Sequence, residues 1–325
     1  MTGYAMDTAQ QWAERRAETM LQLGRLDGRL RGSPCTDIFL AKARLHGAVA
    51  LAGLAGVPID LSDLQDWITG RTPPPRASEG LNDPISVAAV FHLAISRDED
   101  SRDPILRATL NALRTVLDDR SAAALWGGED IAHFGPLWRT VRQQAALPFP
   151  KGGLRAIADR VFAIADLTRA SSADAAEVVT VDGRALSLPS RAPDRNWLIA
   201  VAVPTMLFHA RVTTRVIPSF VLLPKFLPAT PAKLADMMAE SLAKAVRAGL
   251  QELDAIETQA VNLVDLLSVT RRSRAPLLAR LQLAYPGLQP KAVAQLLEIS
   301  PQGARKLLLA ANGHIRTNGG QAPRG

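Results

Sequence analysis

Apolar residues recur at intervals of three or four along most of the chain, and this pattern predicts a mainly α-helical protein. Such intervals place the apolar side chains on one face of a helix. An Asp, Thr or Ser followed by proline marks where several helices begin, and Gly or Pro marks where others end. The pattern predicts helices over residues 8–31, 38–54, 60–68, 103–117, 154–168, 197–208 and 231–267.

One stretch indicates a small β-hairpin instead of a helix. Within residues 177–189, three valines precede the pair Asp182-Gly183 and two leucines follow it. An Asp-Gly pair favours the tight turn that joins two antiparallel strands. Three prolines within residues 216–228 exclude a long helix or a central strand from that segment.

The order of these elements predicts three helical parts and a short tail. A proline-rich loop follows an N-terminal helical segment, 1–70. A helical domain, 85–267, comes next, and a C-terminal domain, 268–316, follows it. The glycine-rich residues 317–325 are expected to form a frayed tail.

The longest predicted helix, 231–267, allows two interpretations. Its apolar face, which includes Leu242, Ile256 and Leu263, suits a helix in the core of its own chain. The same spacing suits a homodimer interface, because helices of coiled coils bury such a face against each other. The core helix is favoured because the charged residues beside this face lack the regular pattern of a coiled coil.

Positive charge is concentrated at the C-terminal end. Residues 271–325 contain nine Lys or Arg and one acidic residue, Glu298, a balance of +8, whereas the whole chain carries +7. A basic segment patterned as short helices is the electrostatic footprint of a protein that binds phosphate backbones.

The same segment has the spacing of a helix-turn-helix. Its predicted helices are 274–285, 290–297 and 301–311. Ser300 is the expected N-cap of the last helix, with a proline in the first turn. Val293, Ala294, Leu297, Ile299, Ala304 and Leu307 are expected to form its small core. Glu298 stands where this turn often has glycine, so its φ is expected to be positive.

The residue types on the last helix favour contact with double-stranded DNA. The residues predicted to face DNA from this helix are Ser300, Gln302, Arg305 and Lys306. Gln and Arg suit base edges, and Lys and Ser suit phosphates. The residues predicted to hold the DNA backbone are Arg271, Arg272, Arg274, Arg280 and Lys291. The alternative is a three-helix end domain with a solvated basic face.

Three stretches of the chain carry a resemblance to known sequences. They are LGRLDGRL at 23–30 with PIDLSDL at 58–64, residues 197–223 with AGLQELD at 248–254, and RRSRAPL at 271–277 with residues 294–308. On these stretches the chain resembles a bacterial family in which an uncharacterised helical domain precedes a helix-turn-helix domain. The first pair also resembles the N-terminal helical segment of Fic proteins, which transfer nucleotides to protein hydroxyls. The resemblance implies a mostly helical fold and DNA binding, with no established reaction.

No group of residues predicts catalysis, a metal site or a cofactor. Fic chemistry needs His-Pro-Phe leading into Gly-Asn-Gly-Arg, and none of the five histidines begins such a motif. The histidines lack metal-ligand spacing, and His92 and His209 are expected to be core residues of apolar helices. A single cysteine, Cys35, excludes an internal disulfide.

The chain is expected to be a cytoplasmic protein without a membrane span. The N-terminal residues 1–31 are polar and charge-alternating, unlike a secretory signal. The most apolar run, 197–208, is shorter than the ~20 residues that a bilayer requires. The expected function is sequence-specific DNA binding by a transcriptional regulator. The alternatives are a helical protein-interaction module and an inactive relative of Fic enzymes.

Overall fold

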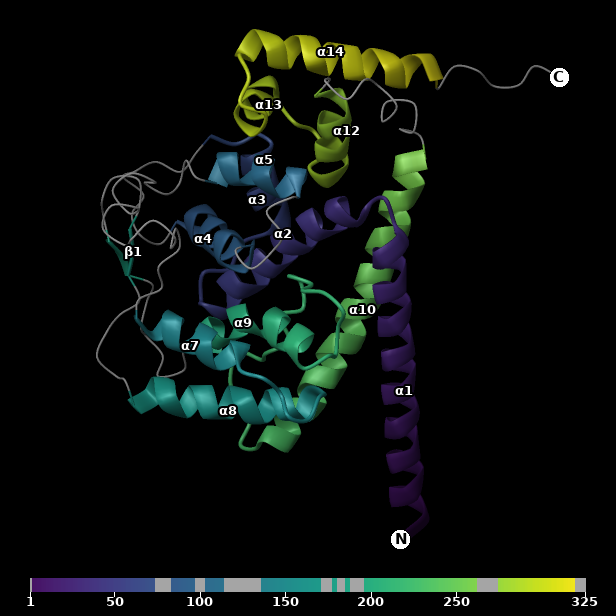
Figure 1. Ribbon diagram of the computed structural model, residues 1–325, viewed down its shortest axis with the longest axis vertical. Coiled ribbons are helices and arrows are strands. Elements are labelled where there is room, and N and C mark those ends of the chain that lie inside the picture. Colours follow the sequence, from purple (N-terminus) through teal and green to yellow (C-terminus); the bar gives the residue numbers. More distant parts are fainter. Residues whose placement is uncertain are drawn as a thin grey trace, which may run out of the picture.

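The protein is helical through nearly all of the chain that the computed structural model describes, and the prediction of a mainly helical protein is confirmed (Figure 1). The described residues are 2–73, 83–96, 103–113, 136–170, 177–179, 185–187, 196–261 and 274–318. The helices are α1 (Thr2–Gly32), α2 (Thr36–Leu54), α3 (Leu61–Ile68), α4 (Pro84–Ser96), α5 (Pro104–Leu113), α7 (Pro136–Ala146), α8 (Leu154–Ala170), α9 (Asn196–His209), α10 (Pro231–Val261), α12 (Ala275–Ala284), α13 (Pro290–Leu296) and α14 (Pro301–Asn318).

Two short strands accompany the helices. β1 (Glu177–Val179) and β2 (Ala185–Ser187) pair antiparallel, with Val178 opposite Leu186. They are the two sides of the hairpin that the sequence predicts. The expected Asp-Gly turn lies outside the described residues.

Side-chain caps begin two helices where the sequence predicts them. Asp103 Oδ1 accepts the backbone N–H groups of Ile105 and Leu106, at 2.9 and 3.0 Å. Thr230 Oγ1 accepts the N–H of Lys233 at 3.3 Å. These bonds satisfy donors that have no partner inside the helix.

The spacing of apolar residues gives no bounds for α4, the apolar helix expected around His92, and does not predict α7. Every residue of α4 from Val87 to Ser96 is buried. This helix therefore has no polar face, and its sequence does not show the alternation of apolar and polar residues that marks a helix at the surface. Helix α7 has such a face, with Trp138 and Val141 buried and Arg139 exposed, and was nevertheless missed.

Helix α2 is the central helix of the fold. It packs against α3, α4, α5, α9, α10 and α12. Its buried residues include Ala41, Ala48 and Ala52, which let the neighbouring helices approach. Most of the other helices therefore depend on α2 for their position.

Another segment of the chain approaches α2 very closely at Gly47. A Cβ atom built there would lie 2.3 Å from the backbone oxygen of Pro218 and 3.0 Å from Ile95 Cδ1. Pro218 belongs to the segment between α9 and α10, which contains neither helix nor strand, as its prolines predict. This irregular segment is thus packed directly on the central helix.

Helix α10 is a core helix of its own chain. It runs unbroken to Val261, and Leu242 and Ile256 are 0% and 1% exposed. Helices α1 and α8 pack along it, and Figure 1 shows α1 beside it at the edge of the molecule. The face expected as an alternative homodimer interface is therefore already covered. Leu263 lies outside the described residues.

The C-terminal helices share the core of the helices before them. Tyr285 is buried, and its hydroxyl lies 2.8 Å from Thr109 Oγ1 of α5. The N–H of Gln289 donates to the carbonyl of Thr69 at 2.9 Å, joining this part to the end of α3. One hydrophobic core includes buried residues from both sides of residue 268, the expected domain boundary.

Arg44 and His92 are polar side chains buried beside the core. Arg44 is 1% exposed and donates to Asp103 Oδ2 at 2.9 Å. His92 is fully buried, and Ser96 Oγ lies 3.2 Å from its Nδ1. Burial, together with the positive charge of Arg44, lowers the pKa of His92 to about 3. His92 is therefore a neutral core residue, as predicted, whereas His209 is exposed and that part of the prediction is wrong.

The close approach at Gly47 predicts a large loss of stability in Gly47→Ala. The new methyl group would overlap the backbone oxygen of Pro218, and such overpacking costs about 1–3 kcal/mol. Gly53→Ala, on the same helix, is the matched control. A Cβ atom there meets nothing within 4 Å, so this change should stabilise the protein by up to ~1 kcal/mol. Urea unfolding measures both, and similar effects of the two changes would contradict the close approach.

The lowered pKa of His92 predicts that the protein loses stability as the pH falls from 6.5 to about 3. The unfolded chain takes up a proton near pH 6.5, while the folded chain resists protonation until about pH 3. Acid therefore favours unfolding, by at most ~1.4 kcal/mol per pH unit. Urea unfolding at several pH values should show that the wild type loses more stability than His92→Gln in this range. If the wild type and His92→Gln lose the same stability over this pH range, the loss does not come from protonation of His92.

Candidate nucleic-acid interface

Helices α12, α13 and α14 form a small three-helix unit at one end of the molecule (Figure 1). Helix α14 packs against both α13 and α12. Val293 and Leu296 of α13 and Ala304 of α14 are buried in this unit. A short turn, 297–300, joins α13 to α14. The order and the short connection are those of a helix-turn-helix.

The turn after α13 is closed by two backbone hydrogen bonds. The N–H of Glu298 donates to the carbonyl of Gln295 at 3.3 Å, and that of Ile299 donates to the carbonyl of Ala294 at 2.9 Å. This is the Schellman arrangement, in which one residue takes a left-handed conformation. That residue is Glu298, whose φ is +50°. The predicted positive φ is confirmed, and it strains any residue except glycine.

The predicted core of this unit is largely confirmed. Val293, Leu297 and Ala304 are buried. Ala294, Ile299 and Leu307 are partly buried and pack against the core. Ala304 has no side chain beyond Cβ, which allows α14 to lie close to α13.

Helix α14 begins at the predicted cap. Ser300 Oγ accepts the N–H of Gly303 at 3.1 Å. A Cβ atom at position 303 would lie 3.3 Å from that oxygen, a tight contact. Glycine lowers the stability of a helix, but at position 303 it leaves space for the capping hydroxyl of Ser300. The helix extends to Asn318, beyond the predicted end, and the residues after it are not described.

The outer face of α14 carries the predicted DNA-contact side chains. Gln302, Arg305 and Lys306 are all exposed, and their spacing of three and four residues places them on one face. Leu309, 73% exposed, lies on the same face. The helix contains no acidic residue. This face therefore combines positive charge, an amide and one exposed apolar side chain.

Two of the predicted backbone-contact residues are exposed on the same three-helix unit, and two lie outside the described residues. Lys291 is exposed in the first turn of α13, and Arg274 is exposed just before α12. Arg271 and Arg272 lie outside the described residues.

Arg280 has a different role from the predicted contact with DNA. Its Nε donates to Asp37 Oδ2 at 2.7 Å, and its Nη2 bonds to Asp37 and to the carbonyl of Pro34. Asp37 lies in the first turn of α2. Arg280 thus ties α12 to the central helix, and because its donors are used there it does not join the exposed basic face.

A further basic residue, Arg107, lies next to this unit. Arg107 of α5 is exposed and lines a cavity of about 410 Å³ together with Asn111, Arg274 and Glu298. Asn111 Nδ2 also donates to the carbonyl of Leu296 at 3.2 Å, which fixes α5 against α13. No sequence signal links Arg107 to the C-terminal segment, because only tertiary packing brings α5 there.

The described helices are all too short or too polar to cross a membrane. Among the described residues, no three His, Cys, Asp or Glu side chains are grouped so that they could hold a metal ion.

Comparison with known protein families, with curated proteins and with solved structures finds no match for this chain. The resemblances to a helix-turn-helix family and to Fic proteins therefore stay predictions.

The strained turn predicts that Glu298→Gly stabilises the protein relative to Glu298→Ala. Both changes remove the carboxylate, but only glycine adopts the positive φ without a steric penalty. The expected difference is about 1 kcal/mol in favour of glycine. Thermal or urea unfolding of the two variants measures it. If alanine is the more stable variant, residue 298 is ordinary helix and the turn is wrongly placed.

Proposed function

We propose that this chain is a sequence-specific DNA-binding protein, a transcriptional regulator, and that it inserts α14 into the major groove of double-stranded DNA. The observation that carries the proposal is the exposed face of α14, held by the turn at Glu298 and the cap at Ser300. In helix-turn-helix proteins the second helix of the motif reads base edges through its N-terminal residues.

The side chains at the start of α14 suit that task. Gln302 and Arg305 are exposed within the first two turns. A Gln side chain matches the donor and acceptor of adenine, and an Arg side chain matches the two acceptors of guanine. Lys306 is exposed beside them and suits a phosphate.

Basic side chains around α14 supply contacts for the DNA backbone. Lys291 is exposed on α13, and Arg274 and Arg107 are exposed beside the cavity at α5. These residues would not distinguish one base sequence from another, since phosphates are the same at every base pair. They would set the position of the protein along the duplex and its affinity for DNA. The net balance of +8 after residue 270 favours the same partner.

Two-fold binding would need a homodimer surface other than the apolar face of α10. Regulators that bind as dimers place two such helices about 34 Å apart on the duplex. In this chain Leu242 and Ile256 of α10 are buried, and α1 and α8 pack against this helix. The proposal is therefore tested first on single sites, without assuming a dimer.

Leu309 favours a second candidate, a helical protein-interaction module. Its side chain is 73% exposed on the same face as Arg305. A leucine in such a place suits the apolar groove of a partner protein. It also suits the methyl group of thymine, so Leu309→Ser would weaken either kind of complex. Binding of naked duplex DNA by the wild type separates the two candidates.

The proposal predicts different losses for a base contact and a phosphate contact. A preferred duplex is selected from random sequences with the full chain, and binding is measured by fluorescence anisotropy. Arg305→Ala should weaken binding to the preferred duplex by about 5–150-fold and change random DNA little. Lys291→Ala should weaken both alike and reduce the slope of log K against log salt by about 0.9.

Lys244→Ala is the matched control, because Lys244 is an exposed lysine of α10. It should leave both affinities unchanged. Failure of the wild type to retain any duplex at about 50 mM salt, where phosphate contacts are strong, would refute the proposal. Equal effects of Arg305→Ala and Lys244→Ala would refute sequence reading by this face.

A further inference from the structure

Leu309 is an apolar side chain on a face of α14 that is otherwise polar. It is 73% exposed, and Gln302, Arg305 and Lys306 are exposed on the same face. Ala304 lies on the opposite side of α14 and is buried. Figure 1 shows α14 as the outermost labelled helix at this end of the molecule. The leucine therefore belongs to the same outer surface as the side chains that are proposed to contact DNA.

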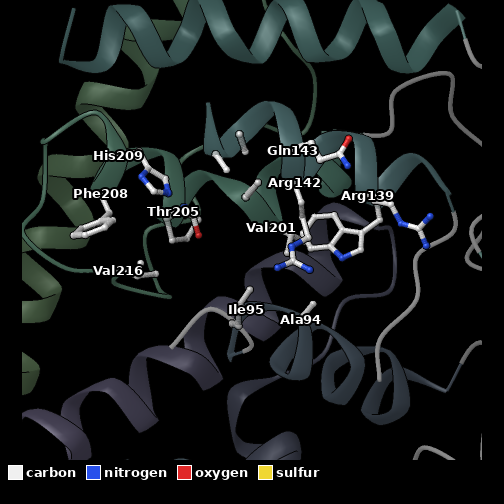
Figure 2. A pocket seen from close by; sticks show the side chains of 15 residues that line it. Ala94, Ile95, Arg139, Arg142, Gln143, Val201, Thr205, Phe208, His209 and Val216 are labelled. Atoms are coloured by element: carbon white, nitrogen blue, oxygen red, sulfur yellow. The ribbon is translucent and has the colours of Figure 1, made fainter. Parts of the chain in front are cut away.

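Exposed apolar residues occur elsewhere in this chain in different surroundings. Phe208, 41% exposed, lines a cavity of about 520 Å³ between α4, α7 and α9, and the centre of its ring lies 5.4 Å from that of the His209 ring (Figure 2). The wall of this cavity includes the buried side chains of Ile95 and Val201. Single exposed apolar residues are also common on protein surfaces. What distinguishes Leu309 is its alignment with residues that suit base edges.

Leu309 is aligned with Gln302 along the helix axis. The two positions are seven residues apart, close to two turns of an α-helix, so both side chains leave α14 on nearly the same side. A rise of about 1.5 Å per residue places them roughly 10 Å apart along the axis. Since base pairs are stacked about 3.4 Å apart, this separation corresponds to about three base pairs of DNA.

The major groove of DNA presents one apolar group at the base edges, the C5-methyl group of thymine. The other groups there are hydrogen-bond donors and acceptors, which lose water without compensation when a leucine side chain covers them. Contact with a methyl group instead removes apolar surface of both partners from water. An apolar side chain in the groove therefore favours thymine over the other three bases.

We infer that Leu309 reads thymine through its methyl group, about three base pairs from the base pair that Gln302 contacts. The inference rests on the proposed binding of DNA by α14, and it adds an apolar determinant of sequence to the polar ones. It assigns the exposed leucine to DNA and not to the groove of a partner protein. The preferred duplex should contain a thymine at this fixed distance from the base pair that Gln302 reads.

Deoxyuridine, which is thymidine without the methyl group, isolates the contact. Each thymine of the selected duplex is replaced in turn by deoxyuridine, and binding of the full chain is measured by fluorescence anisotropy. Replacement at one position should weaken binding by the wild type about fourfold, the factor expected for one buried methyl group. At that position 5-methylcytosine, which carries the same methyl group, should bind about fourfold more tightly than cytosine.

Variants assign this preference to Leu309. Leu309→Ala should bind the thymine and deoxyuridine duplexes equally at the sensitive position, whereas Leu309→Met, which keeps an apolar side chain, should retain the preference. Leu21→Ala is the matched control, because Leu21 is 72% exposed on α1, and it should leave the preference unchanged. Alanine favours helix, and circular dichroism checks that each variant is folded.

A selection repeated with Gln302→Ala locates the base pair that Gln302 reads, because the preference at that position is lost. The sensitive thymine should lie about two to four base pairs from it. A sensitive thymine outside this range would show that the methyl group meets another part of the protein.

The outcomes separate this inference from the proposal on which it rests. If the wild type binds no duplex, DNA binding is refuted and the reading of thymine falls with it. If the wild type binds its duplex and deoxyuridine changes the affinity at no position, DNA binding stands and only the inference is overturned. The inference is also overturned if Leu309→Ala keeps the preference for thymine, or if it weakens binding to every duplex alike.

Discussion

The contact between Gly47 and the backbone of Pro218 is the constraint on which the arrangement of the helices depends. Only a residue without a side chain lets α2 lie so close to the segment between α9 and α10. Because α2 also packs against α4, α5 and α12, its position is transmitted to both ends of the molecule. The cavity wall from α4 and α9 and the C-terminal helices are therefore built on the same central helix.

Hydrogen bonds to α5 orient the C-terminal three-helix unit on the rest of the chain. The hydroxyls of Tyr285 and Thr109 meet in a buried position, and Asn111 donates to the end of α13. Hydrogen bonds are directional and costly to leave unmade when buried. They hold α12 and α13 against α5, and α14 packs on both of these helices. The same packing places Arg107 of α5 in the lining of a cavity together with Arg274 and Glu298.

The candidate interface was predictable where its geometry is local. The turn at Glu298 and the cap at Ser300 involve bonds between residues at most five apart, so residue types alone indicate them. Arg280 was misassigned for the opposite reason. A basic residue in a basic segment looks the same whether it faces solvent or an acid, and its partner Asp37 is 243 positions away. Arg107 was missed because nothing near it in the chain is distinctive.

The sequence by itself determined most of the helices, the caps at Asp103, Thr230 and Ser300, and the concentration of charge after residue 270. The helices and caps depend on neighbours within one or two turns. The tertiary structure alone decided what covers each apolar face. Helices α1 and α8 pack against α10. His209 stays exposed and lines a cavity between α4, α7 and α9. The periodicity of apolar residues indicates which side of a helix is buried, but it does not indicate which other segment packs against that side. That choice depends on close packing between segments far apart in the chain.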